Sequence, residues 1–317
     1  MASRTPRVLS LGGGLDSWVI LLESVRLGQP PDVVVFADVG DADREDPGEW
    51  PSTYRHLDEV VRPFCAERGI EFVVLDTRSY PIRDARSLFA WLWDRGQIPV
   101  AGPDRICTAI AKVERFERWM DARYPGWEVE VWIGFEAGEE SRADKDPNAG
   151  RPRRASGLRA VGKTHRHAKM ANGLRWTRAL AFALSTARRR NRFPLIEWGL
   201  CRCRAEQIAR ASGLPVPRKS ACMGCPYGSR GDWQRLAVER PDVMAKFVEL
   251  ERRKPVTSNG RKLSIMAYDS RTQTGTPLPV YVSRPYRPRP KPCVVCGAPE
   301  RATKATGCDY LHAGAAS

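Results

Sequence analysis

Short runs of apolar residues alternate with longer segments of mixed polarity along the amino-terminal half of the chain. Near-continuous apolar runs are typical of parallel strands that are covered on both faces. The four runs are 8–11, 31–38, 70–76 and 129–135. Helices are expected at about 15–27, 54–68, 87–95, 114–124 and 204–212. This order of elements predicts an α/β fold with a doubly wound parallel sheet.

A run of three glycines separates the first predicted strand from the first predicted helix. Gly12, Gly13 and Gly14 are followed by Asp16 and Ser17, which stand where the helix begins. Because glycine lacks a Cβ atom, the backbone N–H groups can approach a polyanion, and a helix N-terminus favours negative charge. The stretch therefore predicts a pyrophosphate-binding loop, although its spacing matches neither a dinucleotide fingerprint nor a Walker loop. The alternative is a turn that only lets the strand pack close to the helix.

Charged residues follow two other predicted strands. Asp38 ends the second run, and because ligands bind at the carboxyl ends of parallel strands, we expect it beside the glycine loop. Gly134 lies near the end of the fourth run, and Arg142 follows in a Glu-x-x-Arg sequence. Two interpretations of Arg142 stand: a bidentate clamp on a phosphate or sulfate, or a surface ion pair with Glu139.

Composition narrows the class of protein. The 317 residues are 42% hydrophobic, which suits one large α/β core with a smaller appendage. No apolar run approaches 18 residues and no signal-type segment precedes the first strand, so we expect a cytoplasmic protein without a membrane partner. Nine cysteines in such a chain indicate metal binding or thiol chemistry rather than disulfides.

The charge distribution points to a polyanionic partner. The net charge is +15, and no acidic residue occurs between Asp146 and Glu197. His165, His167 and Trp176 are interleaved with the basic residues of this segment. The basic residues are Arg151, Arg153, Arg154, Arg159, Lys163, Arg166, Lys169, Arg175, Arg178, Arg188, Arg189, Arg190 and Arg192. The segment is interpreted as a phosphate-contact surface for nucleic acid, with a solvated basic face as the alternative.

Five cysteines in the middle of the chain are candidate metal ligands. Cys107 precedes Lys112 by five positions, and Lys219 precedes the Cys222-x-x-Cys225 knuckle. Two further cysteines stand just upstream of that knuckle, Cys201 and Cys203. A C-x-x-C pair serves as a redox pair, as half of a zinc site or as part of an iron–sulfur site, and spacing alone does not choose among them.

The glycine stretch resembles the S-G-G-x-D-S loop of the ATP pyrophosphatases, with Gly12 in place of the first serine. The wider arrangement, from about residue 7 to residue 250, resembles the phosphoadenylyl-sulfate reductase-like branch of these PP-loop proteins. That branch includes sulfate-nucleotide reductases, DNA phosphorothioation enzymes and many uncharacterised phage proteins. The segments that carry the resemblance are 12–17, Cys107-x4-Lys112, 134–142 and 219–226.

The resemblance implies cofactors and site residues. ATP and Mg²⁺ are expected at the glycine loop, with Asp38 near the adenosine. A [4Fe–4S] cluster is expected on Cys107, Cys222, Cys225 and Cys203, with Cys201 as the alternative fourth ligand; zinc and a free or redox-active thiol set remain alternatives. The implied catalytic residues are Asp16, Ser17, Lys112, Arg142 and Lys219. The implied nucleotide-binding residues are Gly12, Gly13, Gly14, Asp16, Ser17, Asp38 and Gly134.

The function implied is that of an ATP-dependent adenylating enzyme that releases pyrophosphate and acts in sulfur transfer to nucleic acid. A sulfur-donor protein or a small thiol is a further expected partner, and DNA and RNA both remain possible substrates. One alternative is an adenylyl-sulfate reductase, although the chain lacks the terminal Glu-Cys-Gly-x-His type motif of the thiol-dependent enzymes. Another is a nucleotide-sensing module that binds nucleic acid without turnover.

The carboxyl-terminal tail holds a second group of metal-ligand residues. The Cys293-x-x-Cys296 pair is followed by Cys308 and His312, which matches a small zinc site with three cysteines and one histidine. The alternative is an incomplete knuckle. The predicted organisation is a PP-loop domain at 1–250, with a basic insertion at about 147–193 and a cysteine region at 201–226, followed by a Pro/Arg-rich linker at 251–292 and the tail at 293–317.

Overall fold

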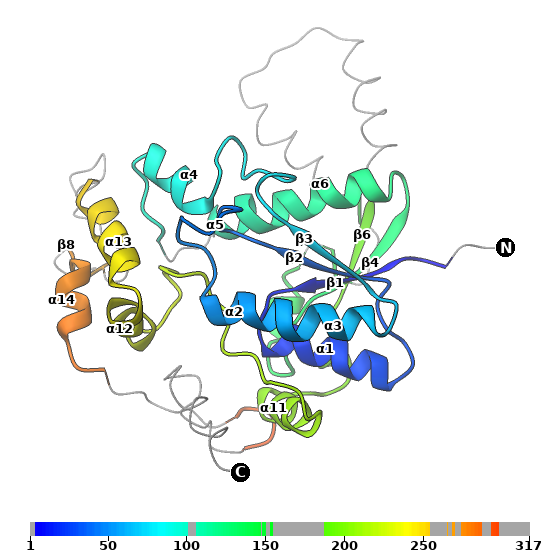
Figure 1. Ribbon diagram of the computed structural model, residues 1–317. Coiled ribbons are helices and arrows are strands. Elements are labelled where there is room, and N and C mark those ends of the chain that lie inside the picture. Colours follow the sequence, from blue (N-terminus) through cyan, green and yellow to red (C-terminus); the bar gives the residue numbers. More distant parts are fainter. Residues whose placement is uncertain are drawn as a thin grey trace, which may run out of the picture. The chain divides into compact units, whose positions relative to one another are not determined.

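The chain forms two compact units in the computed structural model (Figure 1). The structure describes residues 4–100, 106–146, 148–149, 153–154, 187–253, 265, 268–269, 274–286 and 293–297. The first unit consists of Met1–Ala37, Asp58–Leu75 and Val113–Pro215. The second unit consists of Asp38–Leu57, Asp76–Lys112 and Val216–Ser317. Each unit is built from segments that are distant in sequence.

The first unit contains a six-stranded sheet. Its strands are β1 (Arg7–Leu11), β2 (Val33–Ala37), β3 (Glu71–Leu75), β4 (Glu128–Trp132), β5 (Arg153–Arg154) and β6 (Arg188–Arg192). They are ordered β3-β2-β1-β4-β6-β5, and every pair is parallel except β5 with β6. In register, Val8 of β1 lies opposite Val33 on one side and Val131 on the other. All three of these valines are buried, as the continuous apolar runs predict for central parallel strands.

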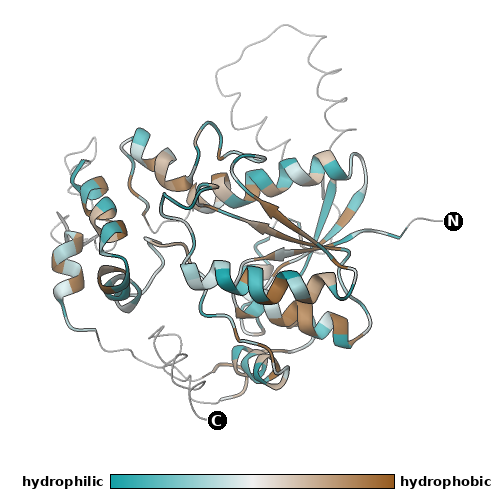
Figure 2. Ribbon diagram, in the orientation of Figure 1, coloured by the Kyte–Doolittle hydropathy of each residue, from teal (hydrophilic) through white to brown (hydrophobic). Residues whose placement is uncertain are grey.

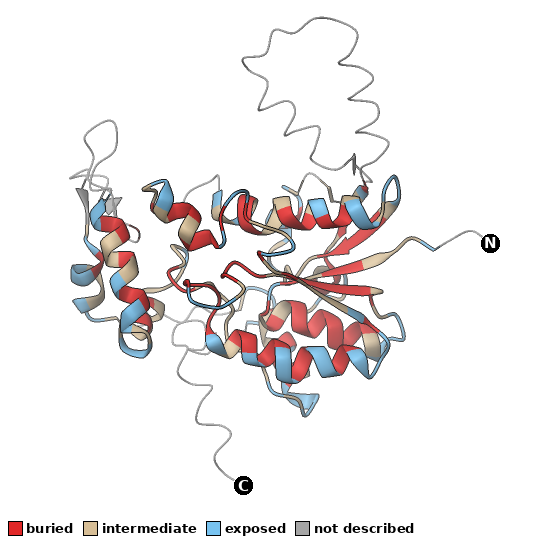
Figure 3. Ribbon diagram, turned by 45° about the horizontal axis from the view of Figure 1, so that its top comes forward, coloured by how far each residue is buried: buried red, intermediate tan, exposed pale blue. Residues whose placement is uncertain are grey.

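Helices cover both faces of this sheet. Among the described residues, the helices of the first unit are α1 (Leu15–Arg26), α3 (Arg62–Ala66), α6 (Glu114–Arg123), α7 (Glu140–Ala143), α10 (Pro194–Glu197) and α11 (Arg202–Ala211). Helix α6 lies on one face and α1 and α3 lie on the other (Figure 1). Because α1 packs against both β1 and the α10–α11 segment, it is buried along most of its length (Figure 3). The predicted α/β class with a doubly wound parallel sheet is confirmed.

Strand β6 departs from the apolar pattern of the other parallel strands. Its sequence is Arg-Arg-Arg-Asn-Arg, whereas β2 is wholly hydrophobic (Figure 2). Carboxylates of the first unit partner three of its arginines: Arg189 with Glu117, Arg190 with Glu128 and Glu130, and Arg192 with Glu130 and Glu197. These arginines therefore hold the strand in the sheet. The phosphate-contact interpretation of the whole segment stays a prediction: Arg188 of this strand is exposed, and Arg151 and residues 155–186 lie outside the described residues.

A Glu130→Gln variant is expected to lose about 2 kcal/mol of unfolding free energy, measured by urea denaturation. Glu130 is 8% exposed and accepts hydrogen bonds from Arg190 at 2.7 Å, from Arg192 at 3.0 Å and from the Trp132 indole at 2.7 Å. An amide cannot match these donors, because its nitrogen does not accept. Glu128→Gln is the matched control on the same strand: that side chain is 30% exposed and lies 3.7 Å from Arg190, so we expect a loss below about 0.5 kcal/mol. Equal losses in the two variants would contradict this account.

The second unit is mainly helical. Its described helices are α2 (Pro51–His56), α4 (Leu88–Asp94), α5 (Ile106–Thr108), α12 (Arg230–Glu239), α13 (Pro241–Arg253) and α14 (Leu278–Ser283). Two π-helical segments, η1 (Leu57–Val61) and η2 (Ala109–Val113), continue across its boundaries with the first unit. It also contains the strand pair β7 (Tyr268–Asp269) and β8 (Thr274–Gly275). Phe247 of α13 lies at the centre of the core, edge-on to Phe89 at 5.3 Å and to Trp233 at 5.7 Å between ring centroids. The buried carboxylate of Glu251 accepts the backbone N–H groups of Ile265 and Leu278, which fixes the start of α14 against α12 and α13.

The predicted helices compare closely with those observed. Helix α4 begins after Ser87, whose side chain accepts a hydrogen bond from the N–H of Ala90, so the helix predicted at 87–95 is confirmed with its cap. Helix α14 falls within the segment 251–292 that was interpreted as a linker from its composition. Within the described residues, no helix combines the length and the apolarity that crossing a membrane requires.

The stability of the second unit is expected to depend on pH through His56. Burial lowers the pKa of His56 to about 4, from an ordinary value of 6.5. Between these pH values the unfolded chain binds a proton that the folded chain excludes, so the unfolding free energy falls as pH drops from 6.5 toward 4, by up to about 3 kcal/mol. Urea denaturation across this range measures the slope. His56→Gln is expected to flatten it, and an unchanged slope in that variant would assign the effect to other groups.

Candidate functional site

The glycine loop joins β1 to α1 in the first unit and is closed by its own serine. The Ser17 hydroxyl accepts the N–H of Gly12 at 3.1 Å and donates to the carbonyl of Gly14 at 3.2 Å. Gly14 is the N-cap of α1, in extended backbone conformation, with no side chain capping the helix. Gly14 thus offers the first turn of α1 no side-chain cap, and the Ser17 hydroxyl holds Gly12 and Gly14 of the loop together. This arrangement can receive an anion.

Gly134, predicted to bind the nucleotide, lies against the same helix terminus. A Cβ built on Gly134 would lie 3.1 Å from the Ser17 nitrogen and 3.2 Å from the Asp16 Cβ. Any larger residue at position 134 would press on the first turn of α1. The glycine at this position therefore allows the loop after β4 to approach the helix N-terminus closely. The structure thus brings together the predicted residues of the loop and Gly134.

Asp16 has a partner that the sequence did not reveal. The Arg202 guanidinium, at the start of α11, donates to Asp16 Oδ1 at 2.7 Å across 186 positions of sequence. Both side chains are about three-quarters buried. In the sequence, Arg202 only separates Cys201 from Cys203, and nothing near it indicates that it would pair with Asp16. The ion pair fixes the carboxylate at the mouth of the loop and couples α11 to α1.

Arg142 forms the ion pair expected of the Glu-x-x-Arg sequence. It binds Glu139, and its guanidinium lies 4.2 Å from the centroid of the Phe135 ring. Phe135 in turn stacks on Phe193, with ring centroids 5.2 Å apart and planes 6° apart. The arginine is 44% exposed, so the surface-pair interpretation describes its state in this structure, and a role in ligand contact remains a prediction.

In the second unit, Asp38 is held by a hydrogen-bonded turn. Its Oδ1 accepts the Tyr54 hydroxyl at 2.7 Å and the Gly40 N–H at 2.9 Å. The Tyr54 hydroxyl also accepts the Glu49 N–H at 3.2 Å. Burial and the neighbouring Asp38 charge raise the pKa of Tyr54, which stays a neutral donor. The carboxylate oxygen Oδ1 is thus engaged in organising the 38–54 loop, and contact with adenosine stays a prediction.

Lys112 sits in a buried electrostatic cluster of the second unit. Its Nζ lies 3.0 Å from Oε1 of Glu49, which is fully buried, while the lysine side chain is 37% exposed. Burial alone would lower the pKa of Lys112, but the Glu49 carboxylate and the Cys222 thiol outweigh it and raise this pKa. Glu49 Oε2 is buried without a hydrogen-bond partner among the described residues. Glu49 was missed in the sequence because nothing local marks it as the partner of a lysine 63 positions away.

Three of the predicted cluster ligands interact in this same region. A hydrogen bond from the Cys222 thiol lowers the pKa of Cys225 to about 7, and the same bond with burial raises the pKa of Cys222. Burial, together with the charge of Cys225, raises the pKa of Cys107. Thiolate donors suit iron or zinc and not magnesium or calcium. Lys112 lies near Cys222 and Cys225 as a cation that could offset thiolate charge, and a metal centre on the three thiols stays a prediction.

The knuckle that carries two of these thiols is closely packed. Gly224 has φ +78°, and a Cβ there would lie 2.0 Å from the Phe247 ring, so only glycine fits. The carbonyl of Cys225 accepts the Gly228 N–H at 2.9 Å and the Trp233 indole N–H at 3.2 Å. An antiparallel bridge joins Cys222 to Glu49. The position of the thiols is therefore determined by the core of the second unit.

Lys219 contacts the first turn of α12. Its Nζ lies 2.9 Å from Asp232, which forms a capping box with Ser229. Burial would raise the pKa of Asp232, but Lys219 and the Ser229 donors lower it on balance. In this structure Lys219 stabilises the start of a helix, and its catalytic role stays a prediction.

The remaining predicted ligands are divided between the two units. Cys201 is the buried N-cap of α11 and Cys203 is half-buried in its first turn, both in the first unit. Cys293 and Cys296 belong to the second unit and flank a turn in which the Gly297 N–H donates to the Cys293 carbonyl at 2.9 Å. Cys308 and His312 lie outside the described residues. The choice of fourth cluster ligand and the zinc site of the tail both stay predictions.

Neither the models of known protein families nor the curated proteins match the chain. Among solved structures, it is similar to one described as the U34-tRNA thiolase NcsA from Methanococcus maripaludis with its [4Fe-4S] cluster. The sequences are 16% identical, the match covers 81% of this chain and 75% of that chain, and the TM-score is 0.38.

Proposed function

We propose that the protein is an adenylating enzyme that binds ATP at the glycine loop and transfers AMP to an oxygen atom of a nucleic-acid substrate. The oxygen attacks the α-phosphorus, and the bond to the β-phosphate breaks to release pyrophosphate. A sulfur nucleophile, supplied by a donor protein or a small thiol, then displaces AMP. The product carries sulfur in place of the activated oxygen.

One observation carries the proposal: the glycine loop ends in an uncapped helix N-terminus at the carboxyl edge of a parallel sheet. The Ser17 hydroxyl holds Gly12 and Gly14 together, and Gly134 leaves room against the first turn of α1. Backbone N–H groups fixed in this way can bind the β- and γ-phosphates without reorganising during the reaction. Mg²⁺ bound with ATP would spread the charge of those phosphates.

The charged residues that the proposal invokes have separable roles. Asp16 is positioned by Arg202, so it can orient the metal-bound phosphates from a fixed place. Arg142 is the more accessible of the predicted cations, and reaching a phosphate would require it to exchange its Glu139 partner. Lys219 would have to leave Asp232 in the same way.

We assign the sulfur half of the reaction to the thiols of the second unit. Cys107, Cys222 and Cys225 would hold a [4Fe–4S] cluster, whose chemistry is to present iron to a sulfur donor. Lys112 offsets the charge of the thiolates, and Glu49 keeps the lysine in place. The net charge of +15 supports a polyanionic substrate.

The test is release of pyrophosphate from ATP labelled in the γ-phosphate, with anaerobically purified protein and a panel of RNA and DNA substrates. The proposal expects release that depends on one class of nucleic acid, with a gain of sulfur in that substrate by mass spectrometry. Absence of release with every nucleic acid, in protein shown to contain iron and sulfide, would contradict it.

A further inference from the structure

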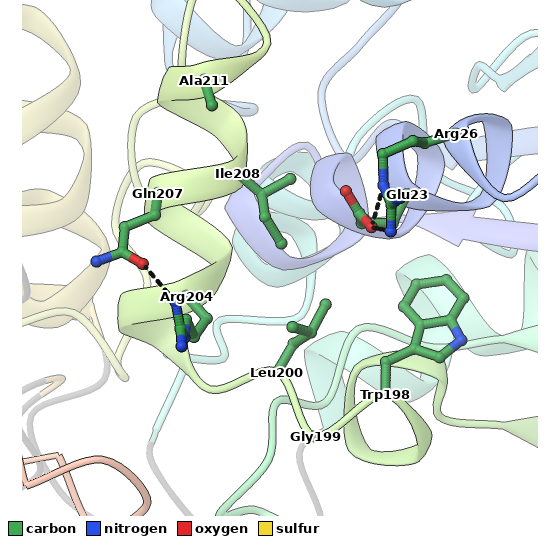
Figure 4. A pocket seen from close by; sticks show the side chains of 9 residues that line it. All are labelled: Glu23, Arg26, Trp198, Gly199, Leu200, Arg204, Gln207, Ile208 and Ala211. Carbon is green, nitrogen blue, oxygen red and sulfur yellow. Dashed lines mark hydrogen bonds and ion pairs between the residues drawn. The ribbon is translucent and has the colours of Figure 1, made fainter.

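A cavity of about 600 Å³ lies in the first unit at the end of α1 that is remote from the glycine loop. Its walls come from α1 and from the α10–α11 segment. Figure 4 shows Trp198 and Arg26 on one side and Arg204 and Gln207 on the other, with Leu200 and Ile208 between them. With a rise of 1.5 Å per residue, Glu23 and Arg26 lie at least about 12 Å along the helix from its N-terminus. The cavity is therefore separate from the proposed ATP site.

Backbone hydrogen bonds fix the turn that carries the aromatic wall of the cavity. Trp198 is the C-cap of α10, and the N–H groups of Gly199 and Leu200 close that terminus by donating to the carbonyls of Ile196 and Leu195 at 3.0 and 2.7 Å. The indole is half-buried, so one part of the ring packs on the protein while another part borders the cavity. A partly exposed aromatic ring is the kind of surface on which a planar ligand stacks.

A net positive charge lies on one side of the cavity. The carboxylate of Glu23 is 10% exposed and pairs with Arg26 at 2.7 Å, so the only acidic side chain of the lining is offset. Arg204 is exposed, and its one described contact is with the amide oxygen of Gln207 at 3.4 Å. Within the part of the chain that the structure describes, no carboxylate lies within ion-pair distance of Arg204. An anionic group is therefore the ligand that this side of the cavity favours.

We propose that this cavity binds one unpaired nucleotide of a single-stranded nucleic acid, with the base on Trp198 and the backbone phosphate at Arg204. Leu200 and Ile208 supply an apolar floor for the base, and Arg26 borders the opposite side. The volume is sufficient for one nucleotide, and the combination of an aromatic ring with guanidinium groups is how proteins bind single strands without reading sequence. The inference rests on the proposed nucleic-acid substrate and adds the place where the strand is held.

The test measures binding alone, without ATP, by fluorescence anisotropy of labelled single-stranded RNA and DNA oligonucleotides of ten uridines or ten thymidines. Trp198→Ala is expected to weaken binding about tenfold, because stacking on one base is lost. Trp198→Phe keeps a planar ring and is expected to stay within about threefold of the unmodified protein. Arg204→Ala is expected to weaken binding about tenfold and to reduce its dependence on salt.

Arg210→Ala is the matched control. It removes one guanidinium from the same helix, but this side chain is paired with Glu206 and does not line the cavity, so we expect less than about a twofold change. Equal weakening in the Arg204 and Arg210 variants would reduce the effect to general surface charge and overturn the proposal. Tight binding by a thermally stable Trp198→Ala variant, no binding of either oligonucleotide to the unmodified protein, or equal competition by polyglutamate would do the same.

These outcomes can be separated from those of the adenylation test. Binding at the cavity without pyrophosphate release would retain the strand-binding site and reject the enzymatic proposal. Pyrophosphate release that is unaffected by the Trp198 and Arg204 variants, with unchanged oligonucleotide affinity, would retain the enzyme and reject the cavity.

Discussion

A Gly12→Leu variant is expected to lose ATP-dependent pyrophosphate release by about 100-fold or more while its melting temperature stays within a few degrees of that of the unmodified protein. A Cβ at this position meets only the Ser17 Oγ, at 4.0 Å, so the protein itself has room for a side chain. A leucine would instead fill the space over the loop that the proposal gives to the phosphates. Thermal unfolding and labelled-ATP turnover, run on the same preparation, measure the two effects.

The matched comparison is Gly12→Ser. Serine stands at this position in the related loop motif, and its hydroxyl adds a donor where a phosphate oxygen would lie. We expect this variant to lose far less activity than Gly12→Leu. Comparable turnover by the leucine variant and the unmodified protein would mean that the space over Gly12 does not bind ATP, and the adenylation proposal would fail with it.

We expect a C222S/C225S double variant, purified anaerobically, to contain at most about one tenth of the iron and sulfide of the unmodified protein. Serine is close in size to cysteine, so the packing of the knuckle on Phe247 is kept while two thiolate donors are lost. In the unmodified protein, Glu49 and the sulfur atoms of Cys222 and Cys225 offset the positive charge of Lys112. In the double variant, only Glu49 of these three groups would offset it. Iron and sulfide analysis, with the visible absorption of the cluster, gives the measurement.

Cys65→Ala is the control for thiol loss. Cys65 is fully buried in the core of the first unit, whereas Cys107, Cys222 and Cys225 belong to the second, so its removal is expected to leave the iron content unchanged. Full iron loading of the double variant would exclude Cys222 and Cys225 as ligands. If the unmodified protein contained zinc and no iron, the thiols would form a zinc site rather than hold a cluster.

The elements of the sheet and the helices beside it were predictable because their signals are local. The run that became β2 is apolar on both faces, as a central parallel strand requires, and β1, β3 and β4 are apolar over most of their length. The glycine loop was predictable for the same reason, since three glycines before a helix start specify a backbone geometry within six residues. Strand β6 was not predicted, because its arginines are kept in the sheet by carboxylates of β4 and of helices elsewhere in the sequence.

The candidate site was predictable only in part. The family resemblance implied the loop glycines with Gly134, and Cys107 with Cys222 and Cys225, and the structure places the members of each set within one unit. The partners that fix the charged residues were not recognised: Arg202 for Asp16, Glu49 for Lys112 and Asp232 for Lys219. A carboxylate and a cation carry no mark in the sequence of which partner each will meet.

By itself, the sequence determined strands β1 to β4 with the helices between them, the glycine loop after β1 and the spacing of the thiols, because each of these depends on neighbouring residues. Only the tertiary structure showed which charges are paired and that Trp198 and Arg204 line one cavity. It also showed that the Phe247 ring leaves no space for a side chain at Gly224. These features depend on side chains from segments up to 186 positions apart. Such contacts exist only once burial of the apolar runs has brought those segments together.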